Sequence, residues 1–430
     1  MPSFRQPGTV LTDHVFEAPL DHAAPDGAQI TLFAREVVAA DNAGGRASDL
    51  PWLVYLQGGP GRAGPRPTGR ESWLDRALRD YRVLLLDQRG TGRSTAANRR
   101  TLAALGSPAA QAAYLAHFRA DSIVADAELI RARLAGGRPW SVLGQSFGGF
   151  CAVSYLSMAP EGLAEVFIAG GLPGLQAGPD DVYRVTYPLV TARNQAHYDR
   201  YPGDVARARR IAGHLARHEV TLPSGAALTV EAFQALGVGL GMSTGSHQLH
   251  YLLEDAFDGE EIGDDFLYRA QSLLTFASGP LYAALHEACY AQGPATRWSA
   301  DRIRADYPVF DARTALASEA PILFTGEMVY PWMFRADPVL RPLAEAADLL
   351  AAREPWPGLY DPDRLAANEV PAAAAVYYED MYVPQQFSVE TAARIRGLRP
   401  WVTSEYDHDG LRSSGGAVLD RLIGMVRGTV

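Results

Sequence analysis

Short apolar runs separated by polar turns mark the first part of this chain. Residues 9–20 and 29–38 mix β-branched and aromatic residues, and an Asp-Gly pair at 26–27 is typical of a turn between two strands. Continuous apolar runs follow at 52–56 and 81–86. Runs of this length without polar interruption predict strands that are buried on both faces of a sheet.

Further along, predicted strands alternate with predicted helices. Residues 121–134 indicate a helix with Asp121 as its N-cap. Its apolar face is formed by Ile123, Ala127, Ile130 and Leu134. An apolar run at 140–143 predicts a strand, 151–159 a helix and 166–171 another strand. Because strand–helix–strand units cross over in the right-handed sense, this alternation predicts a mostly parallel α/β sheet.

The pattern changes near residue 173. Helical stretches rich in Ala, Leu and Arg run from there to about residue 370, and strand patterns resume at 372–378 and 400–405. We therefore expect a sheet core built from residues 1–172 and 371–430, interrupted by a mainly helical cap at 173–370. An amphipathic helix closes the chain through Val418, Leu419, Leu422, Ile423 and Val426.

The composition is that of a large folded protein. The chain has 430 residues, of which 47% are hydrophobic and 20% are charged. This is enough for one large domain with an insertion, or for two domains. A formal net charge of −10 argues against nucleic acid or an anionic membrane as the main partner. All basic residues are arginine, which excludes a lysine nucleophile or base.

Targeting and metal-binding signals are weak. Residues 1–19 lack the pattern of a signal peptide, and no apolar run approaches the roughly 20 residues needed to cross a bilayer. A cytoplasmic location is therefore expected. The two cysteines, Cys151 and Cys289, form no metal-like cluster. We expect neither a metal nor another cofactor.

The clearest chemical motif is Gly-x-Ser-x-Gly at 144–148, between a predicted strand and a predicted helix. A sharp turn at this place strains the backbone of its central residue, so the neighbours must be small. The turn raises the Ser146 hydroxyl above the strand end, and the following helix directs free N–H groups to the same point. Ser146 is therefore the predicted nucleophile of an α/β-hydrolase fold.

A serine hydroxyl needs a base to take its proton, and the base needs an acid to orient it. In an α/β-hydrolase fold the acid comes first and the histidine second, each after a late strand. Of the ten histidines, only His408 follows a late strand, and Asp380 ends the strand before it. The predicted triad is Ser146, Asp380 and His408, with Glu379 and Asp407 as rivals for the acid.

Acyl transfer also needs donors for the developing oxyanion. The amide of Phe147, which follows the nucleophile, supplies one donor. The Gly58-Gly59 turn is expected to supply another, because its glycines let the backbone approach a substrate closely. A second glycine-containing run, 87–94, lacks the full pattern of a nucleotide loop. We expect it to brace loops near the active site, with Arg89 paired to a buried carboxylate.

Three motifs together resemble the proline iminopeptidases, serine peptidases of the α/β-hydrolase superfamily that release N-terminal proline. These motifs are Gly58 to Gly61, Asp87 to Ser94 and Gly144 to Gly149. The chain length and the segments at 325–328 and 405–408 are similar to the larger bacterial form. One departure is Gln57, where the family often has a histidine that is not the catalytic base.

The resemblance implies small peptides with N-terminal proline as substrates. It also implies that cap glutamates bind the protonated N-terminus, since a buried unpaired cation is costly. Glu287 and Glu327 are the candidates for this role. Aromatic residues that could wall a pocket for the proline ring are Phe147, Tyr290, Tyr330 and Trp332.

Two other interpretations stay open at this point. The same triad would serve an esterase, or a peptidase that removes longer N-terminal pieces, because the cap sets the choice of substrate. A non-catalytic binding protein on the same scaffold is the third interpretation. The oligomeric state is not predicted by the sequence.

Overall fold

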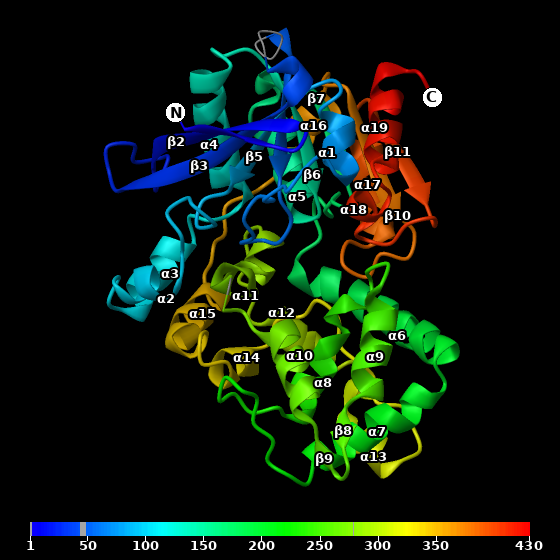
Figure 1. Cartoon of the computed structure of the whole chain (residues 1–430). Coiled ribbons are helices and arrows are strands. Elements are labelled where there is room, and N and C mark those ends of the chain that lie inside the picture. Colours follow the sequence, from blue (N-terminus) through cyan, green and yellow to red (C-terminus); the bar gives the residue numbers. More distant parts are fainter. Residues whose placement is uncertain (1, 44–48, 278) are drawn as a thin grey trace.

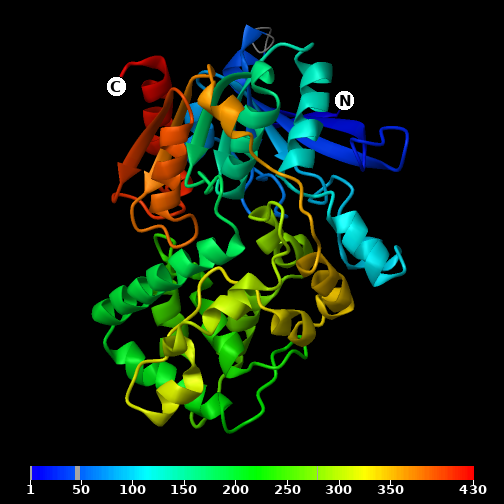
Figure 2. The same cartoon turned by 180° about the vertical axis from the view of Figure 1, so that it is seen from behind.

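The computed structural model describes residues 2–43, 49–277 and 279–430, and it has two halves (Figures 1 and 2). A nine-stranded sheet flanked by helices forms the upper half in Figure 1, and a mainly helical cap lies below it. The strand order is β1-β2-β3-β5-β4-β6-β7-β10-β11. The strands are β1 Ser3–Gln6, β2 Thr9–Pro19, β3 Gln29–Ala39, β4 Trp52–Leu56, β5 Arg82–Asp87, β6 Trp140–Gln145, β7 Leu163–Ala169, β10 Ala372–Tyr377 and β11 Leu398–Thr403.

The sheet is antiparallel from β1 to β5 and parallel from β5 to β11. The prediction of a mostly parallel sheet is thus confirmed. Because parallel strands all point the same way, the loops that follow β4, β6, β10 and β11 meet at one edge of the sheet. The cap lies along this edge (Figure 1).

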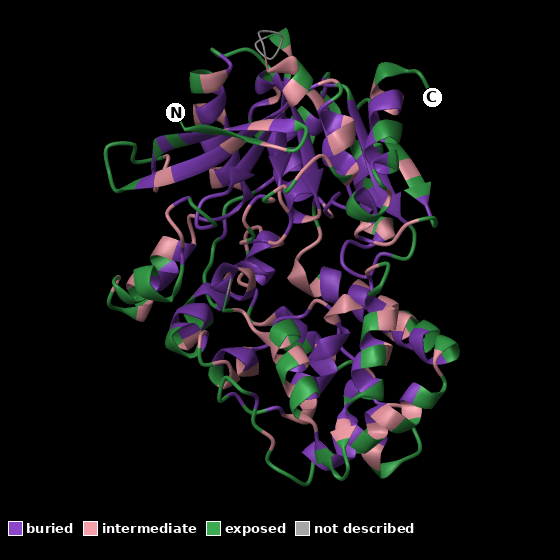
Figure 3. Ribbon diagram, in the orientation of Figure 1, coloured by how far each residue is buried: buried purple, intermediate pink, exposed green. Residues whose placement is uncertain are grey.

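Both faces of the sheet are covered by helices, as the unbroken apolar runs predict. In β4, Val54 belongs to the core shared with α4 (Ala120–Leu134) and α5 (Phe147–Met158). Its neighbour Leu53 belongs to a second core, shared with α1 (Ser72–Ala77) and α19 (Ala417–Arg427). Figure 3 shows the central strands almost entirely buried. This rigid support fixes the loop ends that carry the candidate site.

The segment between β7 and β10 is mainly helical, in line with the predicted cap. Its helices are α6 Pro179–Arg200, α7 Gly203–Leu215, α8 Val230–Gln234, α9 Gly245–Glu254, α10 Asp264–Leu274, α11 Pro280–Leu285, α12 Ser299–Arg304, α13 Ala312–Ala317, α14 Pro331–Ala336, α15 Ala344–Ala351 and α16 Pro362–Ala366. A short hairpin, β8 Phe257–Asp258 and β9 Glu261–Ile262, interrupts them. The domain boundaries at 172 and 370 stay a prediction.

Several elements differ from the sequence prediction. The edge strand β1 and the short helices α1, α2 (Arg99–Ala103) and α3 (Pro108–Leu115) were not predicted. Helix α5 begins at Phe147, directly after the serine, and β11 ends two residues earlier than predicted. Helix α3 packs against α15, so this excursion from the core braces the cap (Figure 2). None of the helices in the described ranges combines the length and apolar character needed to cross a bilayer.

Candidate active site

Ser146 occupies the sharp turn between β6 and α5. Its backbone has φ +55° and ψ −126°, outside the usual regions for a residue with a side chain. The turn is possible only with glycine on either side. A Cβ at Gly148 would lie 1.9 Å from the carbonyl oxygen of Leu56, and one at Gly144 would lie 2.3 Å from that of Gly148. The predicted strand, turn and helix are therefore confirmed.

Three side chains from separate loops meet at this turn. The Nε2 atom of His408 lies 3.0 Å from Oγ of Ser146, and its Nδ1 lies 2.6 Å from Oδ2 of Asp380. The other carboxylate oxygen of Asp380 accepts the N–H groups of Tyr382 and Val383 at 2.8 and 3.0 Å. The carboxylate is thus held in place by the backbone and directs a proton to Nδ1. That tautomer leaves the Nε2 lone pair facing the serine hydroxyl.

The rival acids are engaged elsewhere. Arg193 of α6 donates to Asp407 at 2.6 Å and lies 3.5 Å from Glu379. Glu379 is also exposed, whereas only 1% of the surface of Asp380 is accessible. The structure brings Asp380 to the imidazole of His408, and neither rival contacts that ring in the described residues.

The charge environment of His408 suits a base that becomes cationic during reaction. Burial of the ring lowers its pKa, but the negative charge and hydrogen bond of Asp380 raise it. The carboxylate of Glu327 raises it further, and Arg412 opposes this weakly. The net result is a pKa above the ordinary histidine value. An imidazolium formed here is stabilised by two carboxylates.

The predicted oxyanion elements surround the serine. A Cβ at Gly58 would lie only 3.0 Å from Cβ of Ser146, so only glycine lets this backbone come so close. The side-chain amide of Gln88 donates to the carbonyl of Gln57 at 3.1 Å and holds the start of the loop. Phe147 is the first residue of α5, so its N–H has no acceptor within the helix. Whether Gly58, Gly59 and Phe147 bind an oxyanion stays a prediction.

The run 87–94 braces these loops, as predicted. The fully buried carboxylate of Asp87 accepts the N–H groups of Gly64 and Arg93 and pairs with Arg66.

Within the same run, Arg89 forms a buried pair with Asp126, with N···O distances of 2.7 and 2.6 Å. It also donates to the carbonyls of Leu20 and His117. The expected partner of Arg89 is thus found, on helix α4.

Of the two cap glutamates, Glu327 is the one whose charge acts on His408. The hydroxyl of Tyr282 donates to its Oε1 at 2.5 Å. Besides its effect on His408, its charge adds to burial in raising the pKa of Tyr290 and Tyr382 well above their ordinary range. The ring of Tyr382 lies 4.6 Å from that of His408. Glu327 therefore places a negative charge among the groups around the base.

The carboxylate of Glu287 lies against the first residues of helix α12. Its Oε2 accepts the N–H of Ser299 at 3.0 Å and its Oε1 accepts that of Ala300 at 2.9 Å. Burial raises its pKa to about 7, although these hydrogen bonds oppose the shift. Among the described residues its hydrogen bonds are to Thr296, Ser299 and Ala300, and none is to Ser146, Asp380 or His408. Its role as a substrate ligand stays a prediction.

The predicted aromatic residues fall into two groups. The ring centres of Tyr290 and Phe150 lie 5.7 Å apart, and those of Phe150 and Phe147 lie 6.2 Å apart. These three rings form a row that begins at Phe147, the residue after Ser146. Tyr330 is buried within the cap, where its hydroxyl lies 3.0 Å from that of Tyr187. The first group lies next to Ser146, whereas Trp332, which stacks on Tyr330, lines a cavity that Glu327 also lines.

Within the described residues, the cap has two sizeable cavities, and one of them is lined in part by Glu327. One of about 410 Å³ is lined by Arg62, Tyr282, Glu327 and Trp332. Most of its other lining residues are apolar: Leu222, Ala226, Ala227, Ala232, Ala235, Val238, Leu273, Leu274, Phe276, Met328, Val329, Met333, Ala336, Pro338 and Val339. Glu327, which lines this cavity, is also the cap carboxylate whose charge acts on His408.

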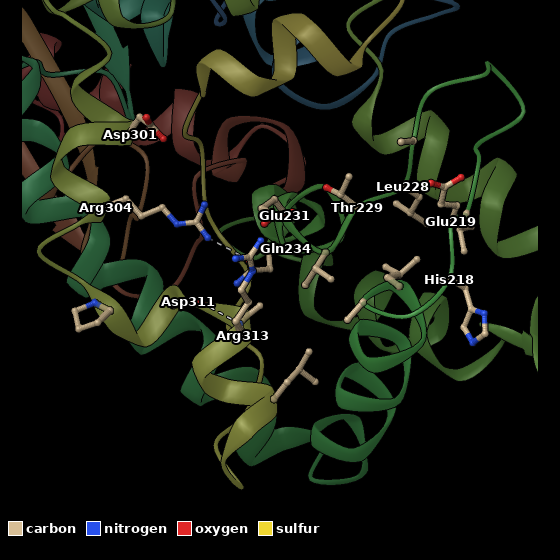
Figure 4. A pocket seen from close by; sticks show the side chains of 18 of the residues that line it. His218, Glu219, Leu228, Thr229, Glu231, Gln234, Asp301, Arg304, Asp311 and Arg313 are labelled. Atoms are coloured by element: carbon tan, nitrogen blue, oxygen red, sulfur yellow. Dashed lines mark hydrogen bonds between the residues drawn. The ribbon is translucent and has the colours of Figure 1, made fainter.

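A wider cavity of about 1050 Å³ is lined only by cap residues between 215 and 316 (Figure 4). Two of its charged side chains, those of Arg304 and Asp311, are hydrogen-bonded to neighbours. Arg304 donates to Oε1 of Gln234 at 3.2 Å and to the carbonyl of Phe310 at 3.1 Å. Asp311 accepts the N–H of Arg313 at 2.9 Å. No residue of the predicted site lines this cavity, so it is separate from the candidate catalytic centre.

Sequence reasoning missed three residues at the site. Tyr282 and Tyr382 pack around Glu327 and His408, and Arg62 lines the same cavity as Glu327. Two of them had a local signal, because Arg62 directly follows Gly58 to Gly61 and Tyr382 comes two residues after the acid. No local sequence signal marked Tyr282, because its partner Glu327 lies 45 residues away in the chain.

Comparison with known proteins supports these assignments of fold and class. The α/β hydrolase fold family matches residues 51–233. A proline iminopeptidase of Aeromonas sobria is 50% identical over 415 residues, covering 96% of each chain. The proline iminopeptidase aneH of Aspergillus aculeatus is 38% identical over 422 residues, covering 95% of this chain and 92% of its own. A solved esterase from Thermogutta terrifontis has a TM-score of 0.41 and 13% identity, covering 95% of this chain and 96% of its own, and this likeness does not bear on the reaction.

Proposed function

The chain belongs to the proline iminopeptidase family, and on this premise we propose that it releases N-terminal proline from peptides through an acyl-enzyme on Ser146. The observation that carries the proposal is the continuous relay from the Ser146 hydroxyl through His408 to Asp380. The reaction uses side chains and backbone groups of the chain together with a water molecule.

The relay supports a two-step acyl transfer. His408 Nε2 takes the proton of Ser146 as Oγ attacks the carbonyl carbon of the N-terminal proline. The oxyanion that forms is bound by the N–H of Phe147 and by the Gly58-Gly59 turn. His408 then gives its proton to the leaving nitrogen, the peptide bond breaks, and the shortened peptide departs. Water, deprotonated by the same ring, releases proline from the ester.

Recognition of the substrate amine is assigned to the cap. Proline carries a protonated secondary amine at neutral pH, and a cation in a closed site needs a carboxylate partner. Glu327 is the primary candidate, because its charge already acts on His408. Glu287 is the second candidate, although both of its oxygens accept backbone N–H groups of α12.

The row of aromatic rings suits the apolar body of the substrate. We assign the wall of the pocket for the proline ring to Phe147 and Tyr290, which are linked through Phe150. Tyr330 and Trp332 stack on each other with ring centres 6.1 Å apart, and Trp332 lines the cavity of about 410 Å³.

A substrate panel tests this proposal. Turnover of proline 4-nitroanilide should exceed that of its N-acetyl derivative by at least about a hundredfold, because the blocked amine carries no charge for Glu327 and loses a charge-assisted hydrogen bond. In a Glu327→Gln variant the ratio of turnover between proline 4-nitroanilide and its N-acetyl derivative should become smaller. Glu345→Gln, on the exposed face of α15, is the matched control and should keep the wild-type ratio. Faster turnover of the N-acetyl substrate, or of a short 4-nitrophenyl ester, would instead assign the chain to the esterases or to peptidases that remove longer pieces.

A further inference from the structure

The cavity of about 410 Å³ that Glu327 lines has a few charged residues among mainly apolar ones. Three charged residues line it: Arg62, Glu327 and Asp337. Asp337 is used by the backbone, since its carboxylate accepts the N–H groups of Val339 and Phe276. The charges left to act on a ligand are therefore the guanidinium of Arg62 and the carboxylate of Glu327.

Arg62 is held at the junction between the core and the cap. It follows the Gly58 to Gly61 loop, and a Cβ at Gly59 would lie 3.3 Å from its backbone nitrogen. Its guanidinium carbon lies 5.3 Å from the centre of the Tyr282 ring. The side chain is exposed, and no carboxylate of the described residues lies within ion-pair distance of it. The positive charge of Arg62 is thus not neutralised by an acid.

Tyr282 joins the two charges into one site. The guanidinium of Arg62 lies over the ring of Tyr282, and the hydroxyl of Tyr282 donates to Glu327. A cation and an anion therefore contact different parts of one aromatic side chain. The loop that carries Arg62 begins at Gly58, which is packed against Ser146. An opposite pair of charges close to a nucleophile is complementary to a small zwitterion.

Resting on the proposed function, we propose that Arg62 binds the free carboxylate of the amino acid that follows the N-terminal proline. The preferred substrates are then dipeptides, with the ammonium group on Glu327 and the carboxylate on Arg62. The side chain of the second residue enters the apolar part of the cavity, so apolar second residues such as leucine are favoured. Planar guanidinium groups match carboxylates in a bidentate geometry, which favours this pairing.

The geometry also gives length discrimination. In a dipeptide the terminal carboxylate lies about 4 Å from the scissile carbonyl, because consecutive Cα atoms are about 3.8 Å apart. Each added residue moves the carboxylate away by up to about 3.5 Å. An arginine attached to the oxyanion loop at Arg62 is therefore expected to bind the carboxylate of a dipeptide in preference to that of a longer chain.

The test compares free acids with amides at each chain length. For wild-type protein, kcat/KM for Pro-Leu should exceed that for Pro-Leu amide by about tenfold, as expected for one charge-assisted contact. The acid preference should vanish in Pro-Leu-Gly and Pro-Leu-Gly-Gly against their amides. This series needs no variant, and an acid-to-amide ratio near one for the dipeptide would overturn the proposal.

Variants locate the effect at Arg62. Arg62→Gln should reduce the dipeptide acid-to-amide ratio about tenfold, and Arg62→Lys should retain part of it. Arg133→Gln, at an exposed arginine on α4, is the matched control and should keep the wild-type ratio. An unchanged ratio in Arg62→Gln would assign the preference to another group and overturn the proposal. Proline 4-nitroanilide has no carboxylate, so its turnover by wild-type protein reports the proposed function separately.

Discussion

Exchanging Asp380 for asparagine isolates its role in orienting the imidazole. The asparagine side chain has one oxygen and one NH2 group in place of two equivalent oxygens. In the structure one oxygen of Asp380 accepts the N–H groups of Tyr382 and Val383, and the other faces Nδ1 of His408. The amide oxygen should stay on the two backbone donors. The reverse orientation leaves two buried N–H groups unsatisfied, which costs about 1–3 kcal/mol each.

In the favoured orientation the NH2 group of the introduced asparagine points at Nδ1 of His408, so the neutral ring must carry its proton on Nε2. That nitrogen then faces Ser146 as a donor and no longer takes the hydroxyl proton. In serine-protease triads the same exchange lowers kcat about 10⁴-fold through the wrong tautomer. At about 1.4 kcal/mol per factor of ten, this is a loss of about 5 kcal/mol of transition-state stabilisation. KM should change little, since Asp380 does not face the substrate.

The assay is steady-state hydrolysis of proline 4-nitroanilide, with urea denaturation to verify that the variant is folded. Asp407→Asn is the matched control, because Asp407 precedes His408 but pairs with Arg193 on α6. It should retain activity within a few fold of wild type. A folded Asp380→Asn variant that loses less than tenfold in kcat would refute the claim that this carboxylate sets the tautomer of the base.

Three further predictions concern pH and stability. Burial lowers the pKa of His408 but Asp380 and Glu327 raise it more, so kcat/KM should fall with acid around a midpoint above the ordinary value of 6.5, as a pH profile will show. Arg89→Met should lower the free energy of unfolding in urea by about 3–5 kcal/mol, because the buried carboxylate of Asp126 loses its arginine partner and keeps only His22 among the described residues. The pKa of Glu287 is about 7 in the folded state against an ordinary 4.5, so the folded state binds the proton more tightly and loses stability as pH rises between these values. In wild type the free energy of unfolding measured in urea should fall by up to about 3 kcal/mol between pH 5 and pH 7, and in Glu287→Gln this fall should be absent.

Each of these has its own control. If kcat/KM falls in acid with a midpoint at or below pH 6.5, the result would contradict the stabilisation of the imidazolium by its neighbours. Arg133→Met, at an exposed arginine of α4, should leave the free energy of unfolding in urea unchanged. An equally small change in Arg89→Met would contradict the stabilising role of the buried Arg89–Asp126 pair. Glu345→Gln should leave the pH dependence of stability as in wild type, and coincident curves for Glu287→Gln and wild type would contradict the burial of that carboxylate.

The sheet half of the fold was predictable because its signals are local. Strands buried on both faces, such as β4, appear in the sequence as unbroken apolar runs. The turn at Ser146 demands glycine at Gly144 and Gly148 for steric reasons within a few residues, so the motif reports the geometry directly. Glu379 and Asp380 both follow the buried strand β10, so the strand pattern located the acid only to this pair, and the structure places Asp380 beside His408.

The cap was predictable only in outline, because its side chains are positioned by contacts distant in sequence. Glu287 is engaged by the start of a helix 12 residues later, and no local pattern distinguishes this capping role from a role in binding substrate. Glu327 meets Tyr282 across 45 residues. The short edge strand β1 was missed because its four residues include a single apolar side chain, Phe4, and the strand depends on pairing with β2.

The central claim is that the hydroxyl of Ser146 forms the acyl-enzyme, and the most direct test is Ser146→Ala assayed with proline 4-nitroanilide. The variant loses one oxygen beside His408, so it should remain folded. We predict a loss of at least about 10⁴-fold in kcat, the scale seen when a triad nucleophile is removed. Turnover within tenfold of wild type would contradict the account.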